Sequence, residues 1–275
     1  MKLYLVFFVC LLRSVAAFSL PSNDVAIRVC SWNLRDFGVS KSDESIRFIA
    51  ETLRDFDIVL IQEVVAGYGG SQAVARLNDE LNRKGSKWDY TVSDPTISSA
   101  YKAERYAVLW KTSRVKKIGK SWLEKTFHTE IDREPFYSTF SIDNKEFTLV
   151  NFHAITKSKQ PETEVKYFKF LPAQYPNLKL IFCGDFNLPE THSVFNPLKK
   201  MGYVAALSSQ KTSLKVKSID GQKLASEFDN FFYFSGKVLE KNSGAVHFYK
   251  LFSDLSNARK ISDHIPIFFE FSIMN

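Results

Sequence analysis

Cysteine is scarce in this chain, which has three among its 275 residues. Cys10 lies in an apolar N-terminal segment, so only Cys30 and Cys183 belong to the rest of the chain. Two cysteines cannot form the network of disulfides that holds a small exported domain together, although a single bridge between them stays open. Both lie in apolar, strand-like runs, where a free cysteine behaves as a small hydrophobic residue.

Zinc-binding motifs are also missing. The sequence has no CxxC pair and no HExxH segment, and His128, His192 and His247 are scattered along it. Linkers, repeats and blocks of like charge are missing as well. Because 45% of the residues are hydrophobic, the composition is compatible with one large core. We therefore expect a single domain over residues 18–275.

The longest N-terminal apolar run is too short to span a bilayer, which takes about 20 residues. It covers ten residues, from Leu3 to Leu12, between Lys2 and the small residues of Val15-Ala16-Ala17. This order is typical of a secretory signal peptide, so we expect residues 1–17 to be cleaved and the protein to be secreted or periplasmic. Arg13 lies close to the expected cleavage site, and an uncleaved anchor is the alternative.

Hydrophobic periodicity predicts an α/β fold in which strands dominate after the first third of the chain. Helices are predicted at 42–56, 69–85 and 193–203. The first has Ile46, Ile49, Ala50 and Leu53 on one face. Strands are predicted at 26–32, 57–63, 87–93, 105–110, 135–142, 146–154, 178–186, 228–234 and 265–271. Many of these strands are rich in aromatic residues, which favours a sheet-on-sheet core flanked by helices.

Polar side chains stand at the ends of several predicted strands. The residues concerned are Asn33, Glu63, His153, Asp185, Asn187, Asp229, Asp263 and His264. Each of them alone reads most simply as a turn former or a solvated group. Together, the carboxylates and the amides are ligands that a hard cation such as Mg²⁺ prefers. The two histidines could transfer protons near neutral pH.

The order of these residues resembles the endonuclease/exonuclease/phosphatase superfamily and, within it, the DNase I-like branch. The resemblance extends from about Ile27 to Phe271, and its motifs are YKAERY (101–106), REPF (133–136), GDFN (184–187) and SDHIP (262–266). It implies a four-layered α/β sandwich of two packed β-sheets flanked by helices. One departure is Val65, which stands near the position where mammalian members carry a DNA-contacting arginine.

The resemblance also implies a role for individual residues. The metal would be bound by Glu63, with help from Asn33 and Asp263. The catalytic residues would be His153 paired with Glu104, His264 paired with Asp229, and Asp185, which would orient the attacking water. Asn187, Arg133 and Thr212 would lie near the substrate phosphate. The implied cofactor is Mg²⁺, with Mn²⁺ or Ca²⁺ as alternatives, and which histidine is the acid and which the base stays open.

The implied activity is that of a secreted, metal-dependent endonuclease that hydrolyses phosphodiester bonds of DNA with little sequence specificity. A lipid phosphodiesterase of the sphingomyelinase type is the alternative, because such enzymes share the metal site and both histidines. A binding protein that had lost catalysis would be expected to lack at least one catalytic residue, and none is missing. We expect a monomer whose partner is the DNA substrate, with no stable protein partner and no transmembrane segment after signal cleavage. The formal net charge of +7 at pH 7 is compatible with a polyanionic substrate but does not require one.

Overall fold

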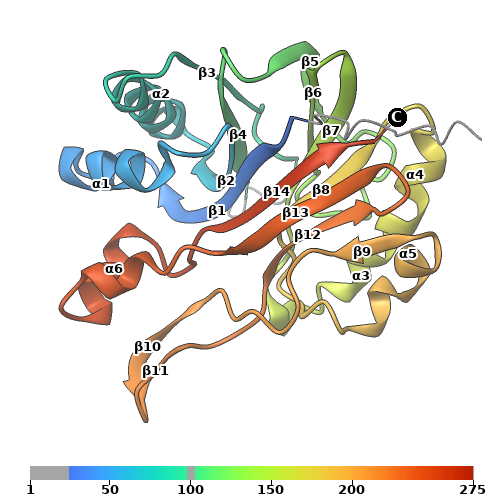
Figure 1. The fold of residues 1–275 in the computed structure, drawn as a ribbon. Coiled ribbons are helices and arrows are strands. Elements are labelled where there is room, and N and C mark those ends of the chain that lie inside the picture. Colours follow the sequence, from blue (N-terminus) through green and yellow to red (C-terminus); the bar gives the residue numbers. More distant parts are fainter. Residues whose placement is uncertain (1–24, 98–102, 275) are drawn as a thin grey trace, which may run out of the picture.

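The computed structural model describes residues 25–97 and 103–274. The expected signal peptide and the first two residues of YKAERY lie outside the described residues. Two β-sheets pack face to face at the centre of the described part, and helices lie on the outer face of each sheet (Figure 1). The predicted four-layered α/β sandwich is confirmed. Among the described residues, no helix is both long and apolar enough to cross a membrane.

The first sheet has the strand order β13-β14-β1-β2-β4-β3. Its central strands β1 and β2 are parallel, and the other neighbours are antiparallel. The bounds are β1 (Ile27–Phe37), β2 (Ile58–Val65), β3 (Trp88–Val92), β4 (Glu104–Lys111), β13 (Val238–Ala245) and β14 (Ile267–Ile273).

The second sheet has the order β5-β6-β7-β8-β12-β9, with β7 and β8 parallel. The bounds are β5 (Lys116–Leu123), β6 (Phe136–Ile142), β7 (Lys145–His153), β8 (Leu180–Asp185), β9 (Tyr203–Ala205) and β12 (Asp229–Phe234). Two further strands, β10 (Leu214–Ile219) and β11 (Gln222–Leu224), form a separate ribbon that projects from the body of the molecule (Figure 1).

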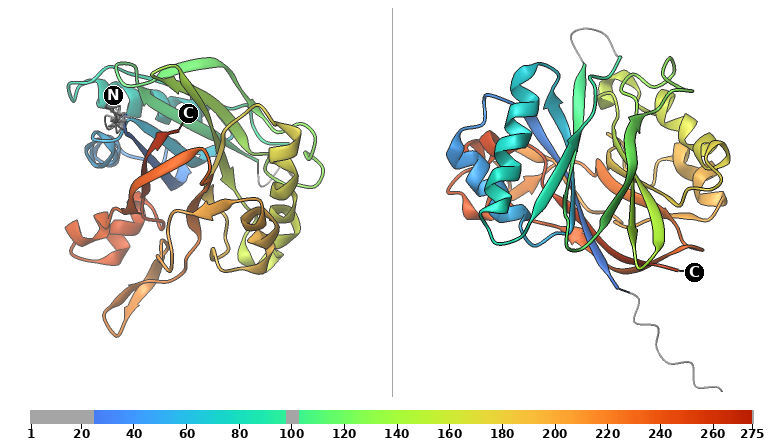
Figure 2. Two further views of the ribbon diagram at one scale, coloured as in Figure 1. Left: turned by 45° about the vertical axis from the view of Figure 1, so that its right-hand side comes forward. Right: turned by 90° about the horizontal axis from the view of Figure 1, so that it is seen from above.

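Helices cover both sheets on their outer faces (Figure 2). On the first sheet these are α1 (Asp43–Leu53), α2 (Tyr68–Asn82) and α6 (Leu255–Ile261), with the 3₁₀ turn η4 (Phe248–Leu251). On the second sheet these are α3 (Glu162–Val165), η2 (Lys166–Phe170) and α4 (Leu171–Gln174) before β8, and η3 (Ser193–Phe195) and α5 (Asn196–Lys200) after it. A short turn, η1 (Lys157–Lys159), precedes α3.

Alternation along the strands divides the apolar side chains between the layers. On β1, Cys30 and Trp32 pack under the helices, whereas Ile27 and Val29 pack between the two sheets. The predicted apolar face of the first helix is confirmed, because all four of its residues are buried on α1. Cys30 and Cys183 are both free in the structure, and burial raises the pKa of each thiol.

Candidate active site

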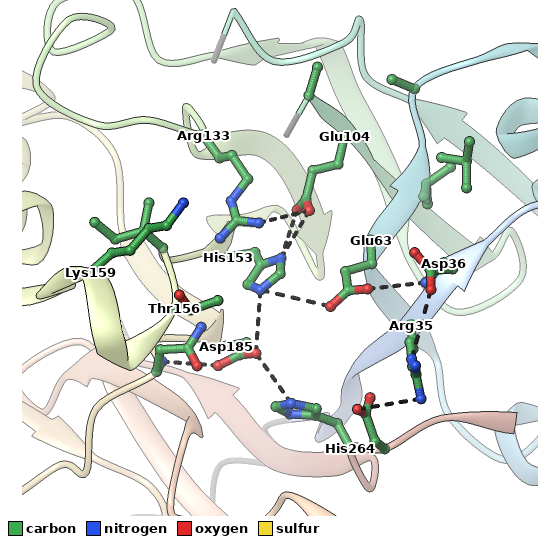
Figure 3. A pocket seen from close by; sticks show the side chains of 17 residues that line it. Arg35, Asp36, Glu63, Glu104, Arg133, His153, Thr156, Lys159, Asp185 and His264 are labelled. Carbon is green, nitrogen blue, oxygen red and sulfur yellow. Dashed lines mark hydrogen bonds and ion pairs between the residues drawn. The ribbon is translucent and has the colours of Figure 1, made fainter. Parts of the chain in front are cut away.

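The predicted polar residues meet at one edge of the two sheets. Parallel pairing brings the carboxyl ends of β1 and β2 together, and likewise those of β7 and β8. In the second sheet His153 pairs with Asp185, and Asp185 pairs with Asp229 on the neighbouring strand. A pocket of about 550 Å³ opens at this edge (Figure 3). The predicted residues that line it are Glu63, Glu104, Arg133, His153, Asp185, Asn187, Asp263 and His264.

Unusual backbone conformations position several of these side chains. Glu63 has a φ of 60°, and the register between β2 and β4 shifts between Ile61 and Val64. A β-bulge of this kind redirects a side chain at a strand end. Gly184 has a φ of 132°, and a Cβ atom there would lie 1.9 Å from the carbonyl oxygen of Phe152. Only glycine therefore lets β8 approach β7 so closely beside Asp185.

His153 is held by the carboxylate of Glu104. Its Nδ1 lies 3.0 Å from both Glu104 oxygens, and Arg133 donates to the same carboxylate at 3.2 Å. A carboxylate only accepts hydrogen bonds, so Nδ1 carries the proton and Nε2 faces the pocket. Burial lowers the pKa of His153, and so does Arg133, but the carboxylates of Glu104 and Asp185 outweigh them and the pKa is raised.

His264 is held in the same way by Asp229. Its Nδ1 lies 2.8 Å from Oδ2 of Asp229, and that oxygen also accepts a bond of 2.6 Å from the hydroxyl of Thr212. Burial lowers the pKa of His264, but the carboxylates of Asp229 and Asp185 outweigh it and raise the pKa to about 10. Each histidine therefore has its own carboxylate: Glu104 on β4 holds His153 on β7, and Asp229 on β12 holds His264, which lies just before β14.

Asp185 lies between the two imidazoles. Its Oδ2 is 3.5 Å from Nε2 of His153 and 3.6 Å from Nε2 of His264. Its Oδ1 accepts from the backbone N–H of Asn187 at 2.9 Å. Burial raises the pKa of Asp185, but the two histidines and these hydrogen bonds lower it below its usual range. An ionised carboxylate thus stands between two nitrogens that can each carry a proton (Figure 3).

Glu63 is the predicted metal ligand that fits a cation best. Its carboxylate lines the pocket, and its side chain is 25% exposed. Asn33 donates to one of its oxygens at 2.8 Å, and the backbone N–H of Asp36 donates to the other at 3.1 Å. These bonds fix the carboxylate and leave lone pairs for a hard cation, which prefers oxygen ligands.

The other two predicted ligands differ from each other. Asp263 lines the pocket, although Arg259 lies 3.2 Å and Arg35 3.8 Å from its Oδ2. Asn33 is buried, its amide nitrogen points at Glu63 and Asp185, and its oxygen accepts from the backbone of Arg35. In this orientation Asn33 donates to both carboxylates and so holds them in place. Of the three predicted ligands, Glu63 and Asp263 line the pocket, whereas Asn33 is not among its lining residues.

A second group of ligand-type side chains lies deeper in the site. Ligand atoms of Asp185, Asp229 and His264 lie within 4.8 Å of one another. His264 and Asp229 already bind each other, however, and the free nitrogen of His264 faces Asp185. These contacts describe a proton-transfer arrangement better than a site for a hard cation.

The three predicted phosphate contacts lie at different depths. Asn187 and Arg133 line the pocket, but each donates to the carbonyl oxygen of Ala154, so both also hold the loop after β7. Thr212 is completely buried and touches Asp229, behind His264. It is not among the residues that line the pocket, and its hydroxyl donates to Asp229 instead.

Periodicity alone did not indicate several residues that help to form the site. Arg35, Asp36 and Lys159 line the pocket, although each lies outside the motifs on which the resemblance is based. Ser262 donates to the carbonyl oxygen of Asn33 at 2.5 Å and accepts from the backbone N–H of His264 at 3.0 Å, which joins the two sides of the site. For Ser262 the SDHIP motif was an available signal, because the serine opens it.

Comparison with known proteins connects this geometry with a family. The model of the endonuclease/exonuclease/phosphatase family matches residues 30–264. A deoxyribonuclease from Thioalkalivibrio sp. (strain K90mix) is 26% identical over 274 residues, covering 90% of this chain and 72% of the relative. Human deoxyribonuclease gamma is 25% identical over 288 residues, covering 90% of this chain and 87% of its own length.

Solved structures share the fold at lower identity. An endonuclease/exonuclease/phosphatase family protein from Bacteroides thetaiotaomicron superposes with a TM-score of 0.65 at 18% identity, covering 92% of this chain and 99% of that one. A mannosyl-6-phosphatase from the same species has a TM-score of 0.63 at 18% identity, covering 90% and 100%. Because the first of these structures carries only the family name and the second is named a phosphatase, the fold alone does not identify a substrate.

Proposed function

The chain belongs to the endonuclease/exonuclease/phosphatase family and is a hydrolase that acts on phosphodiester bonds, and from this premise we propose that its substrate is DNA. The proposed enzyme is a secreted endonuclease that depends on a divalent metal, Mg²⁺ in the first place, and cleaves with little sequence specificity. Support for DNA comes from relatives that are named deoxyribonucleases and match over most of their length.

One observation carries the proposed mechanism: two histidines, each held by its own carboxylate, direct their Nε2 atoms at the carboxylate of Asp185. Hydrolysis of a phosphodiester requires a proton to leave the attacking water and another to reach the leaving oxygen. His153 and His264 can perform these two transfers, with Glu104 and Asp229 fixing the tautomer and the ring orientation of each. Asp185 lies where it can orient the attacking water between them.

Other side chains of the pocket would bind a cation and the substrate phosphate. A divalent cation held by Glu63 with Asp263 would offset the negative charge that develops on the phosphoryl oxygens. Arg133 and Asn187 line the same pocket, where they can contact the substrate phosphate. Asn33 and Thr212 act through their neighbours, since one holds Glu63 and the other holds Asp229.

Parallel assays on two substrates test this proposal. The purified protein is incubated with supercoiled plasmid and, separately, with sphingomyelin vesicles, in Mg²⁺ with and without EDTA. We expect nicked plasmid in Mg²⁺, no nicking in EDTA, and recovery when excess Mg²⁺ is added back. An intact plasmid beside released phosphocholine would refute the nuclease proposal and favour the sphingomyelinase-type alternative. Nicking that persists in EDTA would refute the metal requirement.

The proposed export is tested separately. If residues 1–17 are a signal peptide, the protein recovered from the medium or the periplasm begins at Phe18. N-terminal sequencing of that protein decides the point, and a chain that begins at Met1 would contradict cleavage.

A further inference from the structure

A second cleft lies beside the active-site pocket, with a volume of about 550 Å³. It is formed by the end of β1, the loop after it, the start of α1, α6 and Val216 of β10. Arg35 and Asp36 line both this cleft and the active-site pocket, so the two spaces share a wall. A substrate that extends out of the pocket past Arg35 therefore enters this cleft.

The side chains of the cleft are of two kinds that bind phosphate oxygens. Of its ten lining residues, four are basic, four are serines and one is acidic. The basic residues are Arg35, Lys41, Arg259 and Lys260. Cations and hydroxyl groups beside a single carboxylate favour an anion that accepts hydrogen bonds. No aromatic residue is among the ten, so the lining offers nothing on which a base could stack.

The four basic side chains divide into two that hold the cleft together and two that remain available. Lys41 is buried and donates to the carbonyl oxygens of Lys260 and Ile261, at 3.1 Å and 2.7 Å, which ties the loop after β1 to α6. Arg259 donates to the carbonyl oxygen of Leu214 at 2.6 Å, which ties α6 to the ribbon. These two residues build the walls.

Arg35 and Lys260 are the available pair. The carboxylates nearest to Arg35 lie 3.8 Å from its nitrogens, beyond hydrogen-bond distance, and its side chain is 45% exposed. Figure 3 shows Arg35 at the margin of the active-site pocket, next to Asp36. Lys260 is exposed, and its ammonium donates to the neutral amide of Asn257 at 2.8 Å. Both cations can therefore turn to a ligand at little cost.

The ribbon extends this basic surface away from the body of the protein. Residues 211–224 contain four lysines and one aspartate. Val216 is the one ribbon residue that lines the cleft, and Lys217, which follows it, is exposed outside the cleft. The base of the ribbon is fixed to the catalytic loop, because the backbone N–H of Leu214 donates to the carbonyl oxygen of Asp263 at 2.7 Å and Ser213 forms a β-bridge with His264. The base of the ribbon is therefore held beside Asp263 and His264, and the rest of the ribbon projects from the body (Figure 1).

We propose that this cleft and the ribbon bind backbone phosphates of the DNA beyond the bond that is cut, with Arg35, Lys260 and Lys217 as the contacts. This inference rests on the proposed function. Duplex DNA carries one negative charge per about 1.7 Å of helix axis, so a strand that occupies the active site presents further phosphates to any basic surface next to it. Contacts of this kind position the duplex and carry no sequence information, in agreement with a nuclease of low specificity.

The salt dependence of DNA binding tests the inference. The double variant Lys217→Ala/Lys260→Ala is compared with the wild type and with Lys120→Ala/Lys200→Ala, which removes two exposed lysines from β5 and α5 at the second sheet. Binding of a fluorescent duplex is measured by anisotropy in EDTA over a range of KCl concentrations. Each lost phosphate contact reduces the slope of log K against log[salt] by about 0.9, so we expect a reduction of about 1.8 in the first variant. The control variant should keep the wild-type slope.

Kinetics separate binding from catalysis. The first variant should show a raised KM for plasmid, whereas its hydrolysis of bis(p-nitrophenyl) phosphate, which is too small to reach the cleft, should match the wild type.

A slope of log K against log[salt] that falls by less than about 0.9 in the first variant, or by as much in the control variant, would overturn the inference. If the variant lost sedimentation with anionic vesicles but kept its duplex binding, the surface would serve a membrane and the inference would be wrong. Failure of the wild type to nick plasmid would refute the proposed function instead.

Discussion

Replacing Thr212 by valine distinguishes a residue that orients Asp229 from one that touches the substrate. The Thr212 hydroxyl donates to Asp229 Oδ2 at 2.6 Å and accepts from the backbone N–H groups of Phe228 and Asp229, each at 3.1 Å. Asp229 Oδ2 in turn accepts from His264. The hydroxyl of Thr212 therefore fixes both the carboxylate and the backbone of Asp229, and the position of His264 depends on that carboxylate.

Thr212→Val keeps the shape of the side chain but removes these three hydrogen bonds and a longer contact of 3.5 Å to the carbonyl oxygen of Ser226. Two backbone N–H groups lose their acceptor, at about 1–3 kcal/mol each, and the variant should lose about 3 kcal/mol or more in free energy of unfolding. Because Asp229 then holds His264 less firmly, kcat should fall about 10–100-fold, the range seen when the outer partner of a site residue is removed. KM should stay close to the wild-type value, since Thr212 does not line the pocket.

Urea unfolding and plasmid nicking at several substrate concentrations measure these effects, with Thr212→Ser as the matched control. Serine keeps the hydroxyl and loses one methyl group, so it should cost about 1 kcal/mol and leave kcat nearly unchanged. A valine variant with a raised KM and an unchanged kcat would show a direct phosphate contact and refute the orienting role. A valine variant as stable as the wild type would refute the hydrogen-bond geometry.

Two further predictions concern the framework of the site. Gly184→Ala should lower the free energy of unfolding by at least about 3 kcal/mol, because the new Cβ would lie 1.9 Å from a backbone oxygen and φ is 132°. A melting temperature equal to that of the wild type would contradict this prediction. Burial lowers the pKa of Lys41 from 10.5 to about 8, so between these values the unfolded chain binds more protons and stability rises with pH. The free energy of unfolding of the wild type is compared with that of Lys41→Met in EDTA. The difference between the two should stay constant below pH 8 and shift in favour of the wild type from pH 8 toward pH 10.5. A difference that does not change over this range would show that Lys41 is solvated.

The sequence allowed prediction of those elements whose burial is regular. The first helix and the central strands have one or two buried faces, so their apolar residues recur with the period of the structure. The strand β13 was not predicted, because it lies at the edge of its sheet and most of its side chains are partly or fully exposed. The helix α6 has seven residues, too few for a helical period to stand out.

The residues of the candidate site could be predicted from the sequence, but the hydrogen bonds between their side chains could not. Motif order identified His153, His264 and Asp185, and strand register then places them together. Sequence could not show that the amide of Asn33 faces two carboxylates, or that Thr212 lies behind Asp229, because both depend on side-chain orientation within the fold. The second cleft joins segments far apart in the sequence, so no local pattern could indicate it.

The most direct measurement is the rate of plasmid nicking in Mg²⁺ by His153→Ala and His264→Ala, each compared with the wild type and with a folded control such as Lys120→Ala. If the two histidines transfer the protons of the reaction, each alanine variant should lower kcat by about 10²–10⁴-fold while its unfolding curve stays cooperative. A rate close to that of the wild type in either variant would contradict the account.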